Sequence, residues 1–211
     1  MTYKRVIGPN IIVLTGGPGG GKTTLINELL TTDTEGKRWF ALPESALMLI
    51  QGGLDGYGLY KTGHTSQAKK FQKAVVFLQI AHEDICSDVI ESSIFLLSHR
   101  GALDPLAFWL SNGWAEKDFF TFLNTSREEL YKRYFAVIHL ETAAIDAEKY
   151  YIRDAVTHKR ELSKKAAEID QLCAYVWNRH HNYFFINNKN RNWITKSNQA
   201  KTIIDGLIRS S

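Results

Sequence analysis

Hydrophobic residues in this chain form short continuous runs, separated by longer segments with a different pattern. The runs cover residues 10–15, 38–43, 93–98, 134–140 and 182–187. Apolar runs of this length without alternation are typical of strands that are buried on both faces of a sheet. Because such strands alternate here with helical segments, the pattern predicts an α/β fold with a parallel sheet.

The segments between these runs predict helices, most of them with apolar side chains every three or four residues. They cover residues 24–30, 45–50, 66–90, 106–110, 119–130, 148–165, 166–179 and 195–208. Residues 51–64 differ, since five glycines interleaved with tyrosines disfavour a regular helix and predict a mobile loop of functional length. No internal repeat, low-complexity segment or linker is found, which indicates one continuous domain over residues 1–211.

The sequence GGPGGGKT at residues 16–23 satisfies the phosphate-loop pattern G-x-x-x-x-G-K-[ST] in full. It lies between a predicted strand and a predicted helix, where the helix dipole favours an anion. The glycines allow positive φ, so that backbone amides surround a phosphate, while Lys22 adds a charge and the Thr23 hydroxyl is the expected Mg²⁺ ligand. The residues predicted to bind the nucleotide, ATP, include Gly17, Gly19, Gly20, Gly21, Lys22, Thr23 and Thr24.

Two charged residues directly follow predicted strands. Glu44 comes after the proline that ends the second run, and Arg100 leaves the end of the third. In an open parallel sheet the carboxyl ends of the strands form the ligand crevice, so Glu44 is expected on the same rim as the phosphate loop. A charged arginine directly after a buried strand also suggests a functional position. At that rim Glu44 is in a position to contact a ligand. The alternative is an acid at a helix N-terminus that stabilises the helix dipole.

Some residues in the helical segments leave two interpretations open. Trp109 is either a core residue or a wall on which a ligand stacks, and the core position is favoured. Gln72 and Gln79 lie seven residues apart on one side of the long helix, where they either present an amide to a ligand or, as is commoner, face solvent. Cys86 and Cys173 have no metal-ligand spacing around them, which predicts buried free thiols.

The positive charge of the chain is concentrated at its C-terminal end. The formal net charge is +4, but from residue 171 onward six bases face one acid, whereas the rest carries 20 bases and 21 acids. A basic end of this kind contacts nucleic acid or an acidic partner, is a solvated surface, or belongs to the anion site of a nucleotide enzyme. A solvated surface or an anion site is favoured over a contact with nucleic acid. The six bases are Arg179, Lys189, Arg191, Lys196, Lys201 and Arg209.

Nothing in the pattern indicates a membrane protein. No apolar run approaches the roughly 20 residues that are needed to span a bilayer. Residues 1–5 contain charges but no apolar signal core behind them. We therefore expect a globular cytoplasmic protein that does not bind membranes, and the sequence predicts no oligomeric state.

These motifs together resemble the nucleoside- and nucleotide-kinase-like P-loop ATPases, in particular the small AAA-type ATP-binding domain family related to nicotinamide riboside kinase. The resemblance covers most of the chain and rests on GGPGGGKTT at residues 16–24, PE at 43–44, HRGALDPLAFW at 99–109, HLETA at 139–143 and a basic helix with RE at 160–161. It implies a five-stranded sheet in the order 2-3-1-4-5. It also implies a substrate loop at about residues 51–66 and a lid helix at about residues 148–165.

The resemblance further implies roles for individual residues, with Glu44 as the candidate base for an acceptor hydroxyl. Arg100 and an arginine of the lid helix would neutralise the negative charge that develops on the transferred phosphate. Of the two lid arginines, Arg160 is expected among the catalytic residues and Arg153 among those that bind the nucleotide. The family carries an acidic residue before the arginine that follows strand 3, but this chain has His99 there. Asp104 is then the expected second contact to the metal beside Thr23, with Glu141 as the alternative. ATP is preferred over GTP by resemblance, since no guanine-reading N/T-K-x-D pattern ends a strand.

Two functions follow from these residues. The first is an ATP- and Mg²⁺-dependent phosphotransferase, in which Glu44, Lys22 and Arg100 act on a nucleoside-like or other hydroxyl acceptor bound near residues 57–60 and Trp109. The second is a nucleotide-binding regulatory ATPase or switch with a protein or nucleic-acid partner, which His99 and the basic end favour. A polynucleotide 5′-kinase would combine the two.

Overall fold

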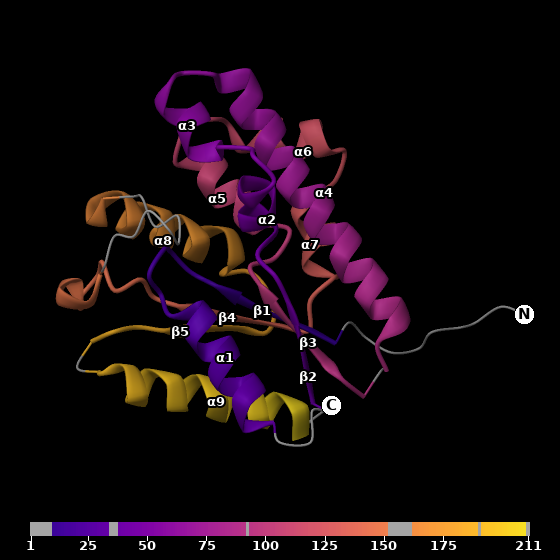
Figure 1. The fold of residues 1–211 in the computed structure, drawn as a ribbon, viewed down its shortest axis with the longest axis vertical. Coiled ribbons are helices and arrows are strands. Elements are labelled where there is room, and N and C mark those ends of the chain that lie inside the picture. The colour runs from indigo at the N-terminus through magenta and orange to yellow at the C-terminus, as the bar shows by residue number, and fades with distance from the viewer. Residues whose placement is uncertain (1–9, 34–37, 92, 152–161, 190, 210–211) are drawn as a thin grey trace, which may run out of the picture.

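The structure, a computed structural model, describes residues 10–33, 38–91, 93–151, 162–189 and 191–209. At its centre lies a five-stranded parallel sheet in the order β2-β3-β1-β4-β5 (Figure 1). The predicted fold class and strand order are confirmed, and each strand begins and ends within two residues of its predicted bounds. The strands are β1 (Ile11–Thr15), β2 (Trp39–Leu42), β3 (Phe95–His99), β4 (Ala136–Leu140) and β5 (Tyr183–Ile186).

Both faces of the sheet are buried, because successive strand residues point to opposite sides and helices cover each side. On one face, Ile12 and Leu14 of β1 pack in a cluster with residues of α1 (Lys22–Thr32) and α9 (Trp193–Arg209). On the other, Val13 packs in a cluster with residues of α4 (Thr65–Val89), α5 (Asp104–Leu110) and α8 (Ser163–Trp177). This arrangement explains why the strand sequences are continuously apolar.

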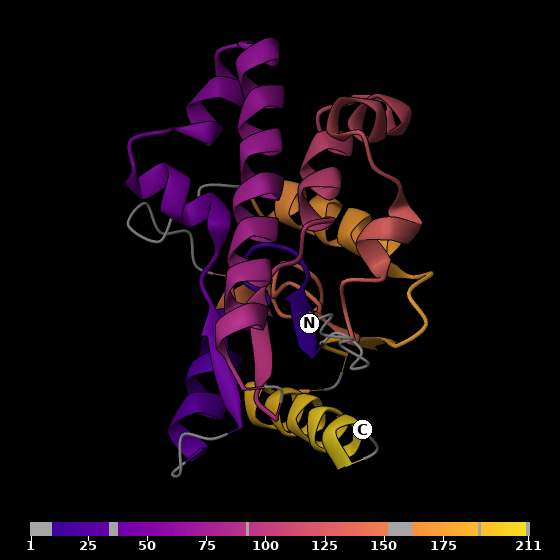
Figure 2. The same ribbon diagram turned by 90° about the vertical axis from the view of Figure 1, so that its right-hand side faces the viewer.

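The remaining helices extend the layer on the α4 side. Figure 2 shows α2 (Ser45–Gln51) and α3 (Gly56–Lys61) beside one flank of α4, with α5, α6 (Glu116–Leu123) and α7 (Arg127–Tyr131) beside the other. All strands run parallel, so their carboxyl ends lie along one edge of the sheet. The phosphate loop, Glu44 and Arg100 therefore emerge along that one edge.

The prediction of a loop without helix over residues 51–64 is wrong. Gly56–Lys61 form α3, and the side chain of Asp55 caps this helix by accepting a hydrogen bond of 3.1 Å from the Gly58 amide. Gly56 lies against the ring of Phe71 on α4, where a Cβ atom would come within 2.5 Å of the ring. The local cap and this close packing together outweigh the low helix propensity of the glycines.

Two predicted helices also have different bounds. The helix predicted over residues 119–130 is divided. Asn124, in a left-handed conformation, is the C-cap of α6, and Ser126 is the N-cap of α7 and forms a capping box. Within the predicted lid helix, Glu148–Tyr150 form a 3₁₀ turn and Ser163 already begins α8. Residues 152–161 lie outside the described residues.

Two smaller expectations can be compared with the structure. Within the described ranges, no helix combines the length and the apolar character that crossing a bilayer requires. Cys86 and Cys173 are both free thiols, as predicted, but only Cys173 is buried, since Cys86 is half-buried.

The central role of the sheet predicts a clear contrast between two Val→Ala substitutions. Val137 in β4 is fully buried, whereas Val89 at the end of α4 is 72% exposed. Val137→Ala is expected to lower the free energy of unfolding by about 1.5–3 kcal/mol, because two methyl groups leave a packed core. Val89→Ala should change it by less than about 0.5 kcal/mol. Urea unfolding of both variants measures the difference, and equal midpoints would contradict the assigned core.

Candidate functional site

The phosphate loop connects β1 to α1 and has the backbone conformation that the glycine pattern predicts. Gly16, Gly19 and Gly21 have positive φ angles, of 119°, 77° and 92°. Gly21 is also the N-cap of α1, and the ring of Trp193 lies against it so closely that a Cβ atom would come within 2.1 Å. Both the backbone angle and this contact require glycine at position 21.

Lys22 is folded into its own loop. Its Nζ atom donates hydrogen bonds to the carbonyl oxygens of Gly16 (3.0 Å) and Gly17 (2.9 Å), and the side chain is buried. Burial, together with the nearby Arg100 cation, lowers the pKa of Lys22 to about 7. A phosphate anion in the loop would stabilise the charged form, so anion binding and protonation of Lys22 favour each other.

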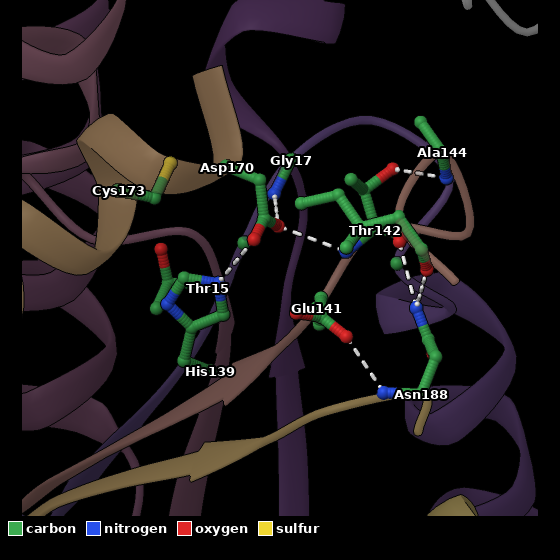
Figure 3. Close-up of polar contacts among 12 residues, drawn as sticks. Thr15, Gly17, His139, Glu141, Thr142, Ala144, Asp170, Cys173 and Asn188 are labelled. Carbon is green, nitrogen blue, oxygen red and sulfur yellow. Dashed lines mark hydrogen bonds and ion pairs between the residues drawn. The ribbon is translucent and has the colours of Figure 1, made fainter. Parts of the chain in front are cut away.

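Asp170 of α8 binds the backbone of the phosphate loop and of the segment after β4, as Figure 3 shows. Its Oδ1 atom accepts hydrogen bonds from the amides of Gly17 (2.6 Å) and Thr142 (2.9 Å), while Oδ2 lies 3.1 Å from Nε2 of His139. The Thr142 hydroxyl in turn donates to the Pro18 carbonyl. Burial opposes ionisation of Asp170, but the hydrogen bonds that it accepts, first from His139, lower its pKa.

A second support comes from the basic C-terminal segment. Lys196 of α9 is buried and donates hydrogen bonds to the carbonyl oxygens of Gly20 (3.3 Å) and Glu141 and to the side chain of Asn188 (2.8 Å). Asn188 also donates to the Thr142 carbonyl at 2.7 Å, a contact visible in Figure 3. Another of the six bases, Lys201, forms an ion pair of 2.6 Å with a carboxylate oxygen of α1. Two of the six bases that suggested a contact with nucleic acid therefore bind groups of the protein itself.

Glu44, His99 and Arg100 meet at the edge of the phosphate loop. Oε1 of Glu44 accepts a hydrogen bond of 3.2 Å from Nε of Arg100, and Oε2 lies 3.3 Å from Nδ1 of His99. The latter pair is close enough for an ion pair but is not aligned as a hydrogen bond. On the other side of the ring, Nε2 of His99 lies 3.1 Å from Oγ1 of Thr23. His99 thus joins the candidate base to the candidate metal ligand.

The charges in this cluster are set by burial and by one another. Burial opposes ionisation of Glu44, but the neighbouring His99, Arg100 and Lys22 outweigh it and lower the pKa of Glu44 to about 2. Burial also lowers the pKa of His99 to about 4, against the opposing effect of Glu44. At neutral pH the carboxylate is therefore charged and the imidazole is neutral.

Arg100 is held in place on several sides. It has a positive φ of 74°, which is uncommon outside glycine, and its Nη1 atom donates to the Gly16 carbonyl and to Oδ1 of Asp104, both at 3.0 Å. Asp104 is completely buried and also accepts hydrogen bonds from Thr15, from the Gly101 amide and from Trp177. Its oxygens are fully engaged, which makes Asp104 a residue that positions Arg100.

A cavity of about 560 Å³ extends from the phosphate loop into the space among α2, α3, α4 and α5. Glu44, His99 and Arg100 lie where the loop meets this cavity. Its apolar wall consists of Leu47, Ile50, Phe71, Val75 and Phe108. The volume is in the range of small-molecule sites, and the cavity opens directly onto the position where a terminal phosphate would lie.

The donors around the Thr23 hydroxyl differ from the set predicted for Mg²⁺. Mg²⁺ prefers oxygen ligands, and the groups that meet here are the hydroxyl of Thr23, the imidazole of His99 and, on the other side of that imidazole, the carboxylate of Glu44. Neither predicted carboxylate replaces the missing one, because Asp104 is engaged and Glu141 accepts a hydrogen bond from the Asn188 amide outside the cavity lining. The described part of the chain contains no cluster of three or more His, Cys, Asp or Glu able to hold a metal ion.

The structure brings together most of the predicted site residues but also differs from the sequence interpretation. Gly19, Gly20, Gly21, Lys22, Thr23, Thr24, Glu44 and Arg100 all line the cavity. Gly17 does not, and its amide is bound by Asp170. Trp109 is a core residue, and Phe108 rather than Trp109 lines the cavity. The two lid arginines, Arg153 and Arg160, lie outside the described residues.

Sequence reasoning missed Asp170 and misjudged Gln79. Gln79 is buried rather than exposed, and its amide group bonds to Ser45, Glu83 and Ser98. Asp170 lies on the buried, largely apolar face of α8. The only sign of its role in the sequence is an acidic residue at a position where the helical pattern predicts an apolar one. A polar residue on an apolar face is usually paired when buried, so this position pointed to a partner without identifying it.

Comparisons with known proteins agree with this fold. A family model described as AAA domain matches residues 11–193. No curated protein sequence matches the chain. Two structures of deoxyadenosine kinase from M. mycoides are similar, each at 13% identity and covering 99% of the kinase. The one with the products dCMP and a flexible dCDP covers 93% of this chain with a TM-score of 0.63, and the one with bound dATP covers 92% with 0.65.

The lowered pKa of Lys22 predicts that nucleotide affinity depends on pH. Because Lys22 loses its proton above a pKa of about 7 in the free protein, and a bound phosphate favours the cation, binding takes up a proton. The affinity for ADP should therefore fall as pH rises above neutrality, by up to about tenfold per pH unit. Calorimetric titration across this range measures it. Lys22→Arg keeps a permanent cation and should give a flat profile, and a wild-type profile equally flat would contradict the assignment.

Proposed function

The chain belongs to the AAA-domain family of P-loop nucleotide-binding proteins, and on this premise we propose that it is an ATP-dependent phosphotransferase acting on a small hydroxyl acceptor, in particular a nucleoside-like molecule. The observation that carries the proposal is the cavity that begins at the phosphate loop and continues past Glu44 into an apolar chamber. A nucleotide triphosphate in the loop would present its terminal phosphate to a molecule in that chamber.

Phosphoryl transfer requires held phosphates, compensating charge and an aligned acceptor. In this proposal the loop amides and Lys22 hold the phosphates, and the helix N-terminus of α1 adds its partial positive charge. Lys22 would exchange its present hydrogen bonds to the Gly16 and Gly17 carbonyls for bonds to phosphate oxygens. A divalent ion with the Thr23 hydroxyl among its ligands would neutralise further charge.

Glu44 is the residue that would meet the acceptor hydroxyl. One of its oxygens is fixed by Arg100, while its side chain is 28% exposed at the loop end of the cavity. With a pKa of about 2 it is an anion at neutral pH and accepts a hydrogen bond from the hydroxyl. Because the transition state of phosphoryl transfer is loose, orienting the hydroxyl matters more than removing its proton beforehand.

The chamber supports a small, partly apolar acceptor. Leu47, Ile50 and Val75 form an apolar wall of the chamber. The ring of Phe108 lies beside the Arg100 guanidinium, with 5.1 Å between the guanidinium carbon and the ring centroid. Aromatic and aliphatic walls of this kind suit a planar ring attached to a polar group that carries the hydroxyl. The M. mycoides kinase, whose structures contain dCMP, dCDP and dATP, supports a nucleoside-like acceptor by its shared fold.

ADP release from ATP in the presence of a divalent ion tests the proposal. The acceptor panel contains nucleosides, other ribosides and short 5′-hydroxyl oligonucleotides, with an acceptor-free control. Stimulation by one small acceptor is expected, and the acceptor that stimulates defines the substrate class. Lys22→Ala should release no ADP under any condition, because the loop loses its phosphate-binding cation. Slow release that no small acceptor changes would contradict the kinase and favour a regulatory ATPase.

Glu44→Gln separates binding from transfer. The amide keeps the size of the side chain but loses the negative charge that aligns the hydroxyl, so the transfer rate should fall by about 10²–10⁴. Affinity for ATP, measured by calorimetry, should change little, since Glu44 does not touch the phosphates in this scheme. Glu128→Gln, at an exposed position on α7, is the matched control and should retain full activity. Full activity of Glu44→Gln would remove Glu44 from this role.

A further inference from the structure

Gln79 of α4 is a buried amide beside the cavity, and the proposed reaction gives it no part. Its hydrogen bonds reach the two segments that carry Glu44 and Arg100. We propose that Gln79 is a positioning residue, which sets the place of Glu44 relative to Arg100 and does not itself bind the acceptor. The inference rests on the proposed function, because it names a residue on which the alignment of the same reaction depends.

The sheet alone does not fix Glu44 and Arg100 against each other. Strands β2 and β3 run side by side, and their last paired residues are Leu42 and Ser98. Glu44 and Arg100 each lie two residues beyond that pair, where the ladder between the two strands has ended. Arg100 also has a positive φ of 74°, which surrounding contacts must hold. The relative position of the two residues therefore depends on contacts outside the ladder.

The amide group of Gln79 provides such a contact to each segment. Its Oε1 atom accepts a hydrogen bond of 2.8 Å from the hydroxyl of Ser45, the residue that follows Glu44 and begins α2. Its Nε2 atom donates a hydrogen bond of 2.8 Å to the hydroxyl of Ser98. That hydroxyl in turn donates to the carbonyl oxygen of Arg100. One side chain thus connects the segment that carries Glu44 to the segment that carries Arg100.

A carboxylate behind the amide fixes its orientation. Nε2 of Gln79 also donates to Oε1 of Glu83, one helical turn further along α4, at 2.9 Å. Glu83 is completely buried and accepts a second hydrogen bond from the hydroxyl of Tyr134 at 2.9 Å. The same hydroxyl accepts from the backbone amide of Ala102. The network that begins at Gln79 therefore holds the turn after β3 at a second point.

These bonds favour a positioning role over a contact with the acceptor. Both N–H groups of Gln79 are engaged, so the amide has no free donor to offer a molecule in the cavity. In the proposed reaction Glu44 orients the acceptor hydroxyl while Arg100 faces the transferred group. A shift of about 1 Å in such an arrangement can lower a rate by about 10²-fold. Loss of the amide should therefore act on the rate of transfer and not on acceptor affinity.

Gln79→Met keeps the length of the side chain but removes its three hydrogen bonds. In the ADP-release assay kcat should fall by about 10–100-fold, while KM for ATP and for the acceptor should change by less than about twofold. Gln67→Met, at an exposed position of the same helix, is the matched control and should retain full activity. A raised KM for the acceptor with unchanged kcat would overturn the inference and make Gln79 a ligand contact.

Ser45→Ala is a milder variant that removes only the link to α2. It should lower kcat by less than Gln79→Met does, and the double variant should be no slower than Gln79→Met alone, since both changes break the same connection. Losses that multiply in the double variant would contradict this connection. Circular dichroism and thermal unfolding establish that each variant is folded, and Ser45→Ala carries the test if Gln79→Met does not fold.

Nuclear magnetic resonance tests the geometry without any turnover. The side-chain Nε–H of Arg100 donates to Oε1 of Glu44 at 3.2 Å, and its signal is assigned by its loss in Arg100→Lys. This signal should shift and exchange faster with solvent in Gln79→Met but stay unchanged in Gln67→Met. An unchanged signal in folded Gln79→Met would overturn the inference. Wild-type protein without acceptor-stimulated ADP release would contradict the phosphotransferase alone, because the Arg100 signal still reports the position of the pair.

Discussion

The interaction on which the rest of the site depends is the pair of backbone amides that one oxygen of Asp170 binds. A loop made almost entirely of glycine has few side chains with which to hold its own shape, and its backbone has more conformational freedom to lose than any other. The carboxylate supplies that order from α8, and Lys196 supplies it from α9. Hydrogen bonds to charged groups contribute about 1.5–3 kcal/mol each, enough to keep such a loop in one conformation.

On the opposite side of the loop the charges are balanced before any ligand is present. The guanidinium of Arg100 pairs with the carboxylates of Glu44 and Asp104, and the imidazole of His99 is neutral. Lys22, with a pKa lowered to about 7, bonds to two carbonyl oxygens. Burying such a group of charges is tolerable only because each has a partner. A phosphate group that entered the loop would therefore compete with partners already in place, such as the Gly16 and Gly17 carbonyl oxygens that Lys22 binds.

Sequence reasoning predicted the elements whose signals are local. The strands, the phosphate loop and the position of Glu44 beside that loop follow from apolar runs, one glycine pattern and the common edge of a parallel sheet. It failed where partners are distant, since Asp170 bonds to a glycine 153 residues away and Lys196 to one 176 residues away. Such bonds leave no periodic pattern. The helix α3 was missed for another reason, because the Asp55 cap and the contact with Phe71 outweigh propensity.

The contact between Trp193 and Gly21 gives the protein an optical consequence. Three of the five tryptophans, Trp39, Trp109 and Trp177, are buried in the core, and Trp114 packs edge-on against Trp109. Trp193 is half-buried and rests on the glycine that begins α1, with its Nε1 atom bonded to Glu28. Its emission should therefore respond to changes around the glycine that begins α1. The chain thus carries a fluorophore in direct contact with its phosphate loop.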